Sequence, residues 1–133
     1  MSLFNVFNIA GSGMSAQSVR LNLTASNLAN AESVATRPED AYRARNPVFQ
    51  SVLDDASAAS VRTAGIVESG ADAEARYAPG HPMADEEGYI FASNVNPMEE
   101  MANMISASRS FQQNVEVMNT SKELLLRTLR LGE

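Results

Sequence analysis

Residues 93–132 read SNVNPMEEMANMISASRSFQQNVEVMNTSKELLLRTLRLG, and this stretch decides the fold. Asn96 is a favoured N-cap residue, Pro97 suits the first helical position, and Glu99 stands where a capping-box carboxylate reaches back to the cap. After Pro97 no Gly or Pro interrupts the chain until Gly132. The sequence therefore predicts one long carboxy-terminal helix that begins at residue 97.

The predicted carboxy-terminal helix carries a heptad-like apolar seam. Alternating steps of four and three residues from Met104 select eight positions, of which six are apolar and two, Ser108 and Lys122, are polar. Such a seam predicts that another helix covers this side. The six apolar positions are Met104, Phe111, Val115, Met118, Leu125 and Leu129.

The amino-terminal segment carries a weaker seam of the same kind, with Gln17 and Thr24 as its polar exceptions. Gly11 and Gly13 each cost about 1 kcal/mol relative to Ala inside a helix. We therefore expect the segment to need a partner in order to be helical. Gly11-Ser12-Gly13 resembles the start of a phosphate-binding glycine loop, but no predicted strand precedes it and no Gly-Lys-Ser or Gly-Lys-Thr follows, so we interpret it as a flexible joint. The large apolar positions of this seam are Leu3, Phe7, Met14, Leu21 and Leu28.

Between the two end segments the chain is acidic and punctuated. Residues 37–96 hold five basic and ten acidic side chains, and every Pro of the chain lies between Pro38 and Pro97. Gly and Pro separate short extended runs, which we predict to be strands. These runs are 42–53, interrupted at Pro47, then 61–67, 75–77 and 88–93.

These patterns predict an α+β fold. Long amino- and carboxy-terminal helices are expected to pack as a coiled-coil-like stem, and the middle is expected to form a small β-rich insert. The expected divisions are an amino-terminal helix within 1–36, the insert over 37–96 and a carboxy-terminal helix over 97–133. Because so little core lies between them, two amphipathic end segments are most naturally completed by neighbouring chains.

The residue types that common catalytic and metal sites need are scarce. The chain has no Cys, and its single histidine, His81, is interpreted as a turn residue, so neither a His-based triad nor a multi-histidine metal site can form within it. Asp85-Glu86-Glu87 lacks the spacing of a calcium loop and is interpreted as a solvated turn. A formal net charge of -6 argues against a nucleic-acid partner. The sequence predicts no catalytic residue, no metal site and no cofactor.

Four stretches, in order along the chain, carry a resemblance to one family. TASNLAN (24–30) resembles the ANNLAN signature near the start of bacterial flagellar rod and hook proteins, and residues 93–132 are similar to the carboxy terminus of proximal rod proteins. YRARNPVF (42–49) and YAPGHP (77–82) also match the family. The resemblance spans nearly the whole chain.

The resemblance implies a structural subunit of the flagellar basal body that polymerises into the proximal rod and has no catalytic activity. It implies that the terminal helices pack together and against neighbours, so that Asn27, Leu28 and Asn30 join the two seams as the expected assembly interface. The implied partners are copies of the chain itself, other proximal and distal rod subunits, the rod-base adaptor, the MS ring and the flagellar type III export apparatus. Nucleic acid and direct membrane insertion are not implied.

The implied location is the basal body, in a rod that crosses the periplasm. The opening residues have neither the charged region nor the apolar run of a cleaved secretion signal, because the first basic residue is Arg20 and Gly and Ser break residues 10–18. We therefore expect export without cleavage of a signal peptide. No apolar run approaches the roughly 20 residues that a membrane helix needs.

A different class of function also fits the two seams. A soluble coiled-coil adaptor or secretion chaperone would use the acidic middle to bind a basic client. A discrete oligomer would favour that alternative, whereas high-order tubular assembly would favour the rod subunit. An enzyme is a distant third, because only carboxylates of the middle segment could act.

Overall fold

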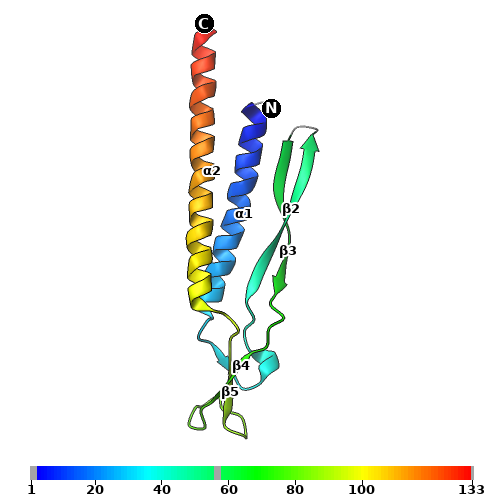
Figure 1. Ribbon diagram of the computed structural model, residues 1–133, viewed down its shortest axis with the longest axis vertical. Coiled ribbons are helices and arrows are strands. Elements are labelled where there is room, and N and C mark those ends of the chain that lie inside the picture. The colour runs from blue at the N-terminus through cyan, green and yellow to red at the C-terminus, as the bar shows by residue number, and fades with distance from the viewer. Residues whose placement is uncertain (1–2, 56–57, 133) are drawn as a thin grey trace. The chain divides into compact units, whose positions relative to one another are not determined.

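The computed structural model describes residues 3–55 and 58–132. In these residues the chain forms two long helices, α1 (Leu3–Ala29) and α2 (Pro97–Leu131), separated by strands (Figure 1). The predicted α+β class is confirmed. The elements between the helices are, in order, β1 (Val34–Ala35), a 3-10 helix (Pro38–Asp40), β2 (Arg45–Asp55), β3 (Ala58–Glu68), β4 (Glu74–Tyr77) and β5 (Tyr89–Ala92).

The chain divides into two compact units that are discontinuous in sequence. The first unit takes the described residues of 1–21, 47–65 and 105–133, and the second takes 22–46 and 66–104. Each long helix contributes to both units, as do β2 and β3. The described residues of 47–65, which were predicted to belong to the β-rich insert, therefore belong to the same unit as residues 3–21 of α1 and 105–131 of α2.

The predicted start of α2 is confirmed. The Asn96 side-chain oxygen Oδ1 accepts hydrogen bonds from the backbone N–H groups of Met98 at 3.1 Å and Glu99 at 3.4 Å. These groups are among the first N–H donors of a helix, which have no partner within the helix itself. Asn96 therefore caps α2, with Pro97 at its first position.

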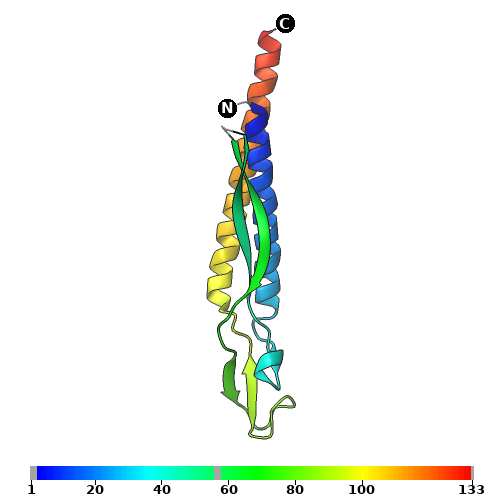
Figure 2. The same cartoon turned by 90° about the vertical axis from the view of Figure 1, so that its right-hand side faces the viewer.

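Helix α1 runs through Gly11 and Gly13 without a break, so the interpretation of this segment as a flexible joint is wrong. In the first unit a Cβ atom added to Gly13 would lie 2.9 Å from the side-chain nitrogen of Asn114 on α2. The glycine thus permits the close approach of Asn114 on α2. In this unit the two helices lie side by side in Figure 1, and α1 lies in front of α2 in Figure 2. Ser12 adds a link to β3, because its hydroxyl accepts a hydrogen bond from the N–H of Val61 at 3.1 Å.

The residues buried in the first unit are small. Ala107 is completely buried, whereas the neighbouring seam position predicted from the sequence, Ser108, is only half-buried. Ser121 is buried and Lys122 is exposed, so the predicted seam is shifted by one residue at these two steps. In contrast, the larger apolar residues of the predicted seams in this unit, such as Met14 and Phe111, are only half-buried. The buried residues of this unit are Ala10, Ala16, Ala58, Ala107 and Ser121.

The second unit contains a three-stranded antiparallel sheet with β5 in the centre. β1 pairs through Val34 with Ala92, and β4 pairs through Tyr77 with Tyr89. Ile90 and Ala92 are buried. The predicted strands at 75–77 and 88–93 are confirmed as β4 and β5, and those at 42–53 and 61–67 correspond to the two-stranded β2–β3 sheet. The predicted interruption at Pro47 is wrong, because β2 begins at Arg45 and runs through Pro47. β1 and the 3-10 helix were not predicted.

The two glycines of α1 should respond differently to alanine. Gly11→Ala should raise the free energy of unfolding by about 0.5–1 kcal/mol through helix propensity, because its Cβ would meet only Met118 Cε at 3.8 Å. Gly13→Ala should bring no gain, because its Cβ would displace Asn114, whose amide donates to the Ser110 carbonyl at 2.9 Å. Urea unfolding followed by circular dichroism measures both changes.

The matched control is Gly13→Ala combined with Asn114→Ala, which removes the obstructing side chain and should recover the helix-propensity gain. Equal stabilisation at Gly11 and Gly13 in the otherwise unchanged chain would contradict the close approach.

Candidate assembly interface

A buried asparagine holds three segments of the second unit together. The side chain of Asn27, near the end of α1, is only 1% exposed. Its Oδ1 accepts hydrogen bonds from the Arg45 N–H at 2.9 Å and the Tyr42 hydroxyl at 3.0 Å. Its Nδ2 donates to the Arg45 carbonyl at 2.9 Å and to a Glu100 carboxylate oxygen at 3.3 Å. Both donors and both acceptor positions of the amide are thus used.

Further contacts surround this amide. Ser26 and Tyr42 share a hydroxyl–hydroxyl hydrogen bond of 3.2 Å, and the Arg45 guanidinium lies 5.7 Å from the centre of the Tyr42 ring. Beside Arg45, the N–H of Ala44 donates to the side chain of Asn94 at 2.7 Å. The chain between α1 and β2 is therefore anchored by side-chain amides at two consecutive residues.

The structure places the two predicted asparagines inside contacts of the single chain. Asn27 is enclosed as described, and the Asn30 amide donates to the Ser26 carbonyl at 2.8 Å, one turn back along α1. Both side chains therefore shape the subunit, and their part in contacts between subunits stays a prediction.

The predicted apolar positions keep part of their surface free. They are half-buried, apart from Leu129, which is 62% exposed. Contacts within one chain therefore leave each of them some area for a neighbour. The half-buried positions are Leu3, Phe7, Met14, Leu21 and Leu28 on α1 and Met104, Phe111, Val115, Met118 and Leu125 on α2.

Sequence reasoning missed a second set of exposed apolar residues on α2. Because the seam selects one stripe, it ignores apolar residues on other faces, yet a helix that is apolar on several sides is expected to be surrounded. The signal in the sequence is the density of leucines near the end of the chain, because residues 124–131 read LLLRTLRL and place leucines on more than one side of the helix. The exposed members are Met98, Met101, Ile105, Val117, Leu124, Leu126 and Leu131.

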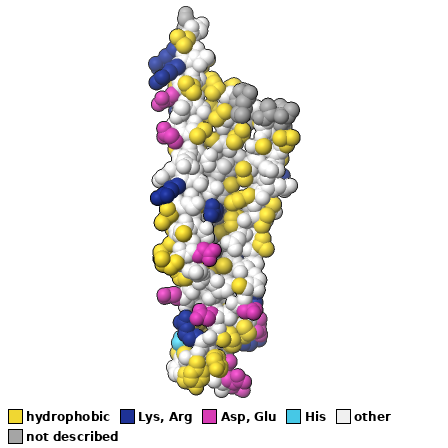
Figure 3. Space-filling view, viewed as in Figure 1, with side chains coloured by type: hydrophobic (Ala, Val, Ile, Leu, Met, Phe, Trp, Pro, Cys, Tyr) yellow, Lys and Arg dark blue, Asp and Glu magenta, His cyan; other side chains and the backbone are white. Residues whose placement is uncertain are grey.

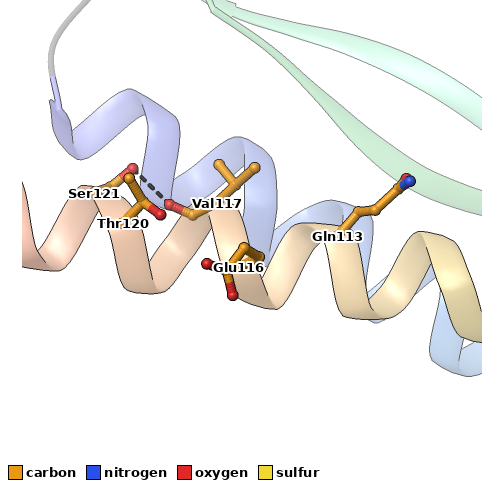
Figure 4. Close-up of a pocket in the computed structure, with 5 residues that line it drawn as sticks. All are labelled: Gln113, Glu116, Val117, Thr120 and Ser121. Carbon is orange, nitrogen blue, oxygen red and sulfur yellow. Dashed lines mark hydrogen bonds between the residues drawn. The ribbon is translucent and has the colours of Figure 1, made fainter.

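Two neighbouring surfaces of the first unit add to this apolar area. A shallow depression on α2 is lined by Val117 together with polar side chains, and the Ser121 hydroxyl donates to the Val117 carbonyl at 2.8 Å within it (Figure 4). Hydrophobic side chains also form separate exposed patches on this face of the protein (Figure 3). In the first unit the exposed large apolar residues of the β2–β3 sheet are Val48, Phe49, Leu53 and Val61.

The turns of the second unit show what its polar residues do. The His81 ring nitrogen Nδ1 accepts a hydrogen bond from the Met83 N–H at 3.0 Å, which confirms the turn interpretation. Asp85 is more than a solvated residue, because its carboxylate accepts from the N–H groups of Glu87 at 3.0 Å and Tyr89 at 2.8 Å. Among residues 3–55 and 58–132 no cluster of three His, Asp or Glu side chains is arranged to hold a metal ion.

None of the described helices is both long enough and apolar enough to span a bilayer. This matches the charge pattern of α2, which carries Glu99 and Glu100 in its first turn and Arg130 in its last. The exposed apolar residues of α2 are thus interspersed with charged ones along its length.

Comparison with known proteins places this arrangement in a class. The family described as flagella basal body rod protein matches residues 7–34, and the family described as flagellar basal body rod FlgEFG protein C-terminal matches residues 86–131. Both matches lie on the terminal helices and their flanks. The fold and these matches define a flagellar basal-body rod protein.

Relatives with full-length coverage narrow the class. Flagellar basal-body rod protein FlgC of Escherichia coli O6:H1 is 49% identical, that of Yersinia enterocolitica 50% and that of Salmonella typhimurium (strain LT2) 48%, each over 100% of both chains. The chain therefore belongs to the FlgC family of flagellar basal-body rod proteins. It is a structural subunit of the rod.

The three acidic residues of the 85–87 turn should contribute differently to the free energy of unfolding. Asp85→Ala removes the acceptor of two backbone N–H groups and should lower the free energy of unfolding by about 1 kcal/mol. Glu86→Ala and Glu87→Ala should each change it by less than about 0.5 kcal/mol. Thermal unfolding of the three variants, together with the amide exchange rate of Tyr89, measures the difference. Equal effects at all three positions would show that the Asp85 hydrogen bonds do not hold the turn.

Proposed function

We propose that the chain is a non-catalytic subunit of the proximal rod, and that it polymerises through apolar residues that both helices leave exposed. The observation that carries the proposal is the exposure of large apolar side chains on α2, including Leu124 at 50% and Leu131 at 88%. Burying a leucine side chain completely stabilises a contact by about 1.5–3 kcal/mol. Neighbouring subunits that cover these residues would gain that free energy repeatedly along the polymer.

The composition of the buried seam supports the same proposal. Inside the first unit the fully buried residues are small, and the large apolar residues of the seams are half-buried or exposed, so they keep part of their surface free. A large patch of exposed apolar residues commonly marks an interaction site, whereas single exposed apolar residues are ordinary. The half-buried seam positions, Phe111 and Leu125 among them, would form the edges of that surface.

The partners that we propose are other copies of the chain and the neighbouring rod proteins, from the rod-base adaptor and MS ring to the distal rod. We further propose that the chain is exported by the flagellar type III apparatus without cleavage, and that it functions in the part of the rod that crosses the periplasm. The names of the relatives favour this reading over a coiled-coil adaptor or secretion chaperone.

Polar replacement of exposed leucines should impair assembly without unfolding the chain. Leu124→Gln with Leu129→Gln keeps good helix formers at two exposed positions and removes apolar area worth about 1 kcal/mol at each if half of it is covered by a neighbour. We expect smaller motility-plate diameters and fewer intact basal bodies by electron microscopy, with helix content unchanged by circular dichroism.

The matched control is Glu123→Gln in the same stretch. Glu123 is exposed, and its ion pair with Arg127 is long, at 3.9 Å, and lies at the surface, so its loss should matter little. This variant should swim normally. Normal swimming of the double leucine variant at normal protein levels would contradict the proposed assembly surface.

Export without cleavage makes a separate prediction. Protein recovered from purified basal bodies should retain its amino-terminal segment, and deletion of residues 2–30 should abolish both export and motility. Amino-terminal sequencing and immunoblots of the secreted fraction measure this. A rod-incorporated protein shortened at its amino terminus would show that the export proposal is wrong while leaving the assembly surface intact.

A further inference from the structure

We propose that Asn27 is a positioning residue of the rod subunit: its side-chain amide stands in for a neighbouring β-strand at Arg45 and, through Glu100, sets the start of α2 against the end of α1. All the groups involved lie in the second unit. The proposal goes beyond family membership, because it assigns a chemical task to one residue of the 24–30 stretch.

The geometry at Arg45 is that of strand pairing. In an antiparallel pair, one residue exchanges both an N–H···O and an O···H–N hydrogen bond with the residue opposite. The Asn27 amide does the same from a helix, because Oδ1 accepts from the Arg45 N–H and Nδ2 donates to the Arg45 carbonyl, both at 2.9 Å. Arg45 is the first residue of β2, so the amide is placed where that strand begins.

The second donor of the amide reaches the other helix. Asn27 Nδ2 also lies 3.3 Å from a carboxylate oxygen of Glu100, which is itself only 6% exposed. Glu100 belongs to the first turn of α2 and its backbone N–H donates to the Asn96 carbonyl. The end of α1, the start of β2 and the start of α2 therefore meet on one side chain.

Other residue types cannot make this set of contacts. Aspartate has no donor, and it would bring a second carboxylate beside Glu100. The side chains of alanine and leucine offer neither donor nor acceptor, and would leave the Arg45 backbone N–H and carbonyl and the buried Glu100 carboxylate without their hydrogen bonds to Asn27. Glutamine has the same amide but an extra methylene, for which a side chain that is 1% exposed leaves no room.

This task matters because the connection has little regular structure of its own. Between Ala29 and Arg45 the regular structure is a two-residue strand and one 3-10 turn. Short elements of this kind cannot define a path by themselves. A polymer requires every copy to present the same surfaces, so a single buried amide that fixes where β2 and α2 begin would act on assembly without touching a neighbour.

The test is a charge-balanced pair of substitutions in the full-length protein. In Asn27→Asp the new carboxylate has no donor for the Arg45 carbonyl and is repelled by the Glu100 carboxylate. Its displacement should break the hydrogen bond from the Arg45 N–H and accelerate exchange of that amide proton about ten- to hundredfold. Asn27→Asp with Glu100→Gln restores the formal charge and gives the new carboxylate an amide donor. The double variant should exchange about tenfold more slowly than Asn27→Asp alone and should regain part of its motility.

Asn119→Asp is the matched control, since Asn119 is an exposed residue in the middle of α2. It makes the same chemical change and should leave both Arg45 exchange and swimming unchanged. A general loss of helix stability would not be rescued by Glu100→Gln, so the rescue separates positioning from overall stability.

Three results would overturn the proposal. One is an Arg45 amide that exchanges at the unfolded-chain rate in the unsubstituted protein, a measurement that does not depend on any variant folding. Another is an effect of Asn27→Asp no larger than that of Asn119→Asp. The third is a double variant that behaves like Asn27→Asp alone.

Discussion

A buried side-chain amide must have its hydrogen bonds made, because each polar group left alone away from water costs about 1–3 kcal/mol. Asn27 meets this requirement only if three parts of the chain arrive together: Tyr42, the backbone of Arg45, and Glu100. The rest of the second unit depends on that meeting. Nearby, the half-buried Asn94 side chain also joins two backbone segments, because it accepts from the Ala44 N–H and donates to the Ala71 carbonyl.

In the first unit the constraint is different: the two helices pack together while their large apolar residues keep part of their surface exposed. Gly13 and Ala107 allow a close approach with little apolar area, and larger residues such as Phe111 are left half-buried. A helix pair that only had to be stable would place leucines in the centre of the contact. The observed allocation suits the assembly surface that we propose, because the large apolar residues keep area that a neighbouring subunit would cover.

Local signals in the sequence predicted local features well. The Asn96-Pro97 pair predicted the start of α2, since a cap and its first turn are neighbours in the chain. The strands β4 and β5 followed from Gly and Pro punctuation. The strand β1 could not be predicted, because Val34 and Ala35 are extended only through pairing with Ala92 and Phe91.

Spacing along the sequence selected only some of the apolar residues that the single chain leaves exposed. Counting large apolar residues found the stripe at Met104 and Phe111, but the true phase of the seam depends on small residues of both helices, and spacing along one helix does not reveal it. Likewise the 24–30 stretch drew attention to Asn27 through family resemblance alone. The contacts that define its task join residues 18 and 73 positions apart in the chain, which no local pattern reports.

The exposed carboxy-terminal turns of α2 also bear on thermodynamics. Leu129 and Leu131 are largely accessible in a single chain, so the free energy that holds those turns in helical form is partly supplied by whatever covers them. Folding of this segment and association with a neighbour then become one linked equilibrium, in which apparent stability rises with subunit concentration. A subunit that is only marginally ordered while dilute would acquire its full rigidity at the growing end of the rod, where neighbours are fixed in place.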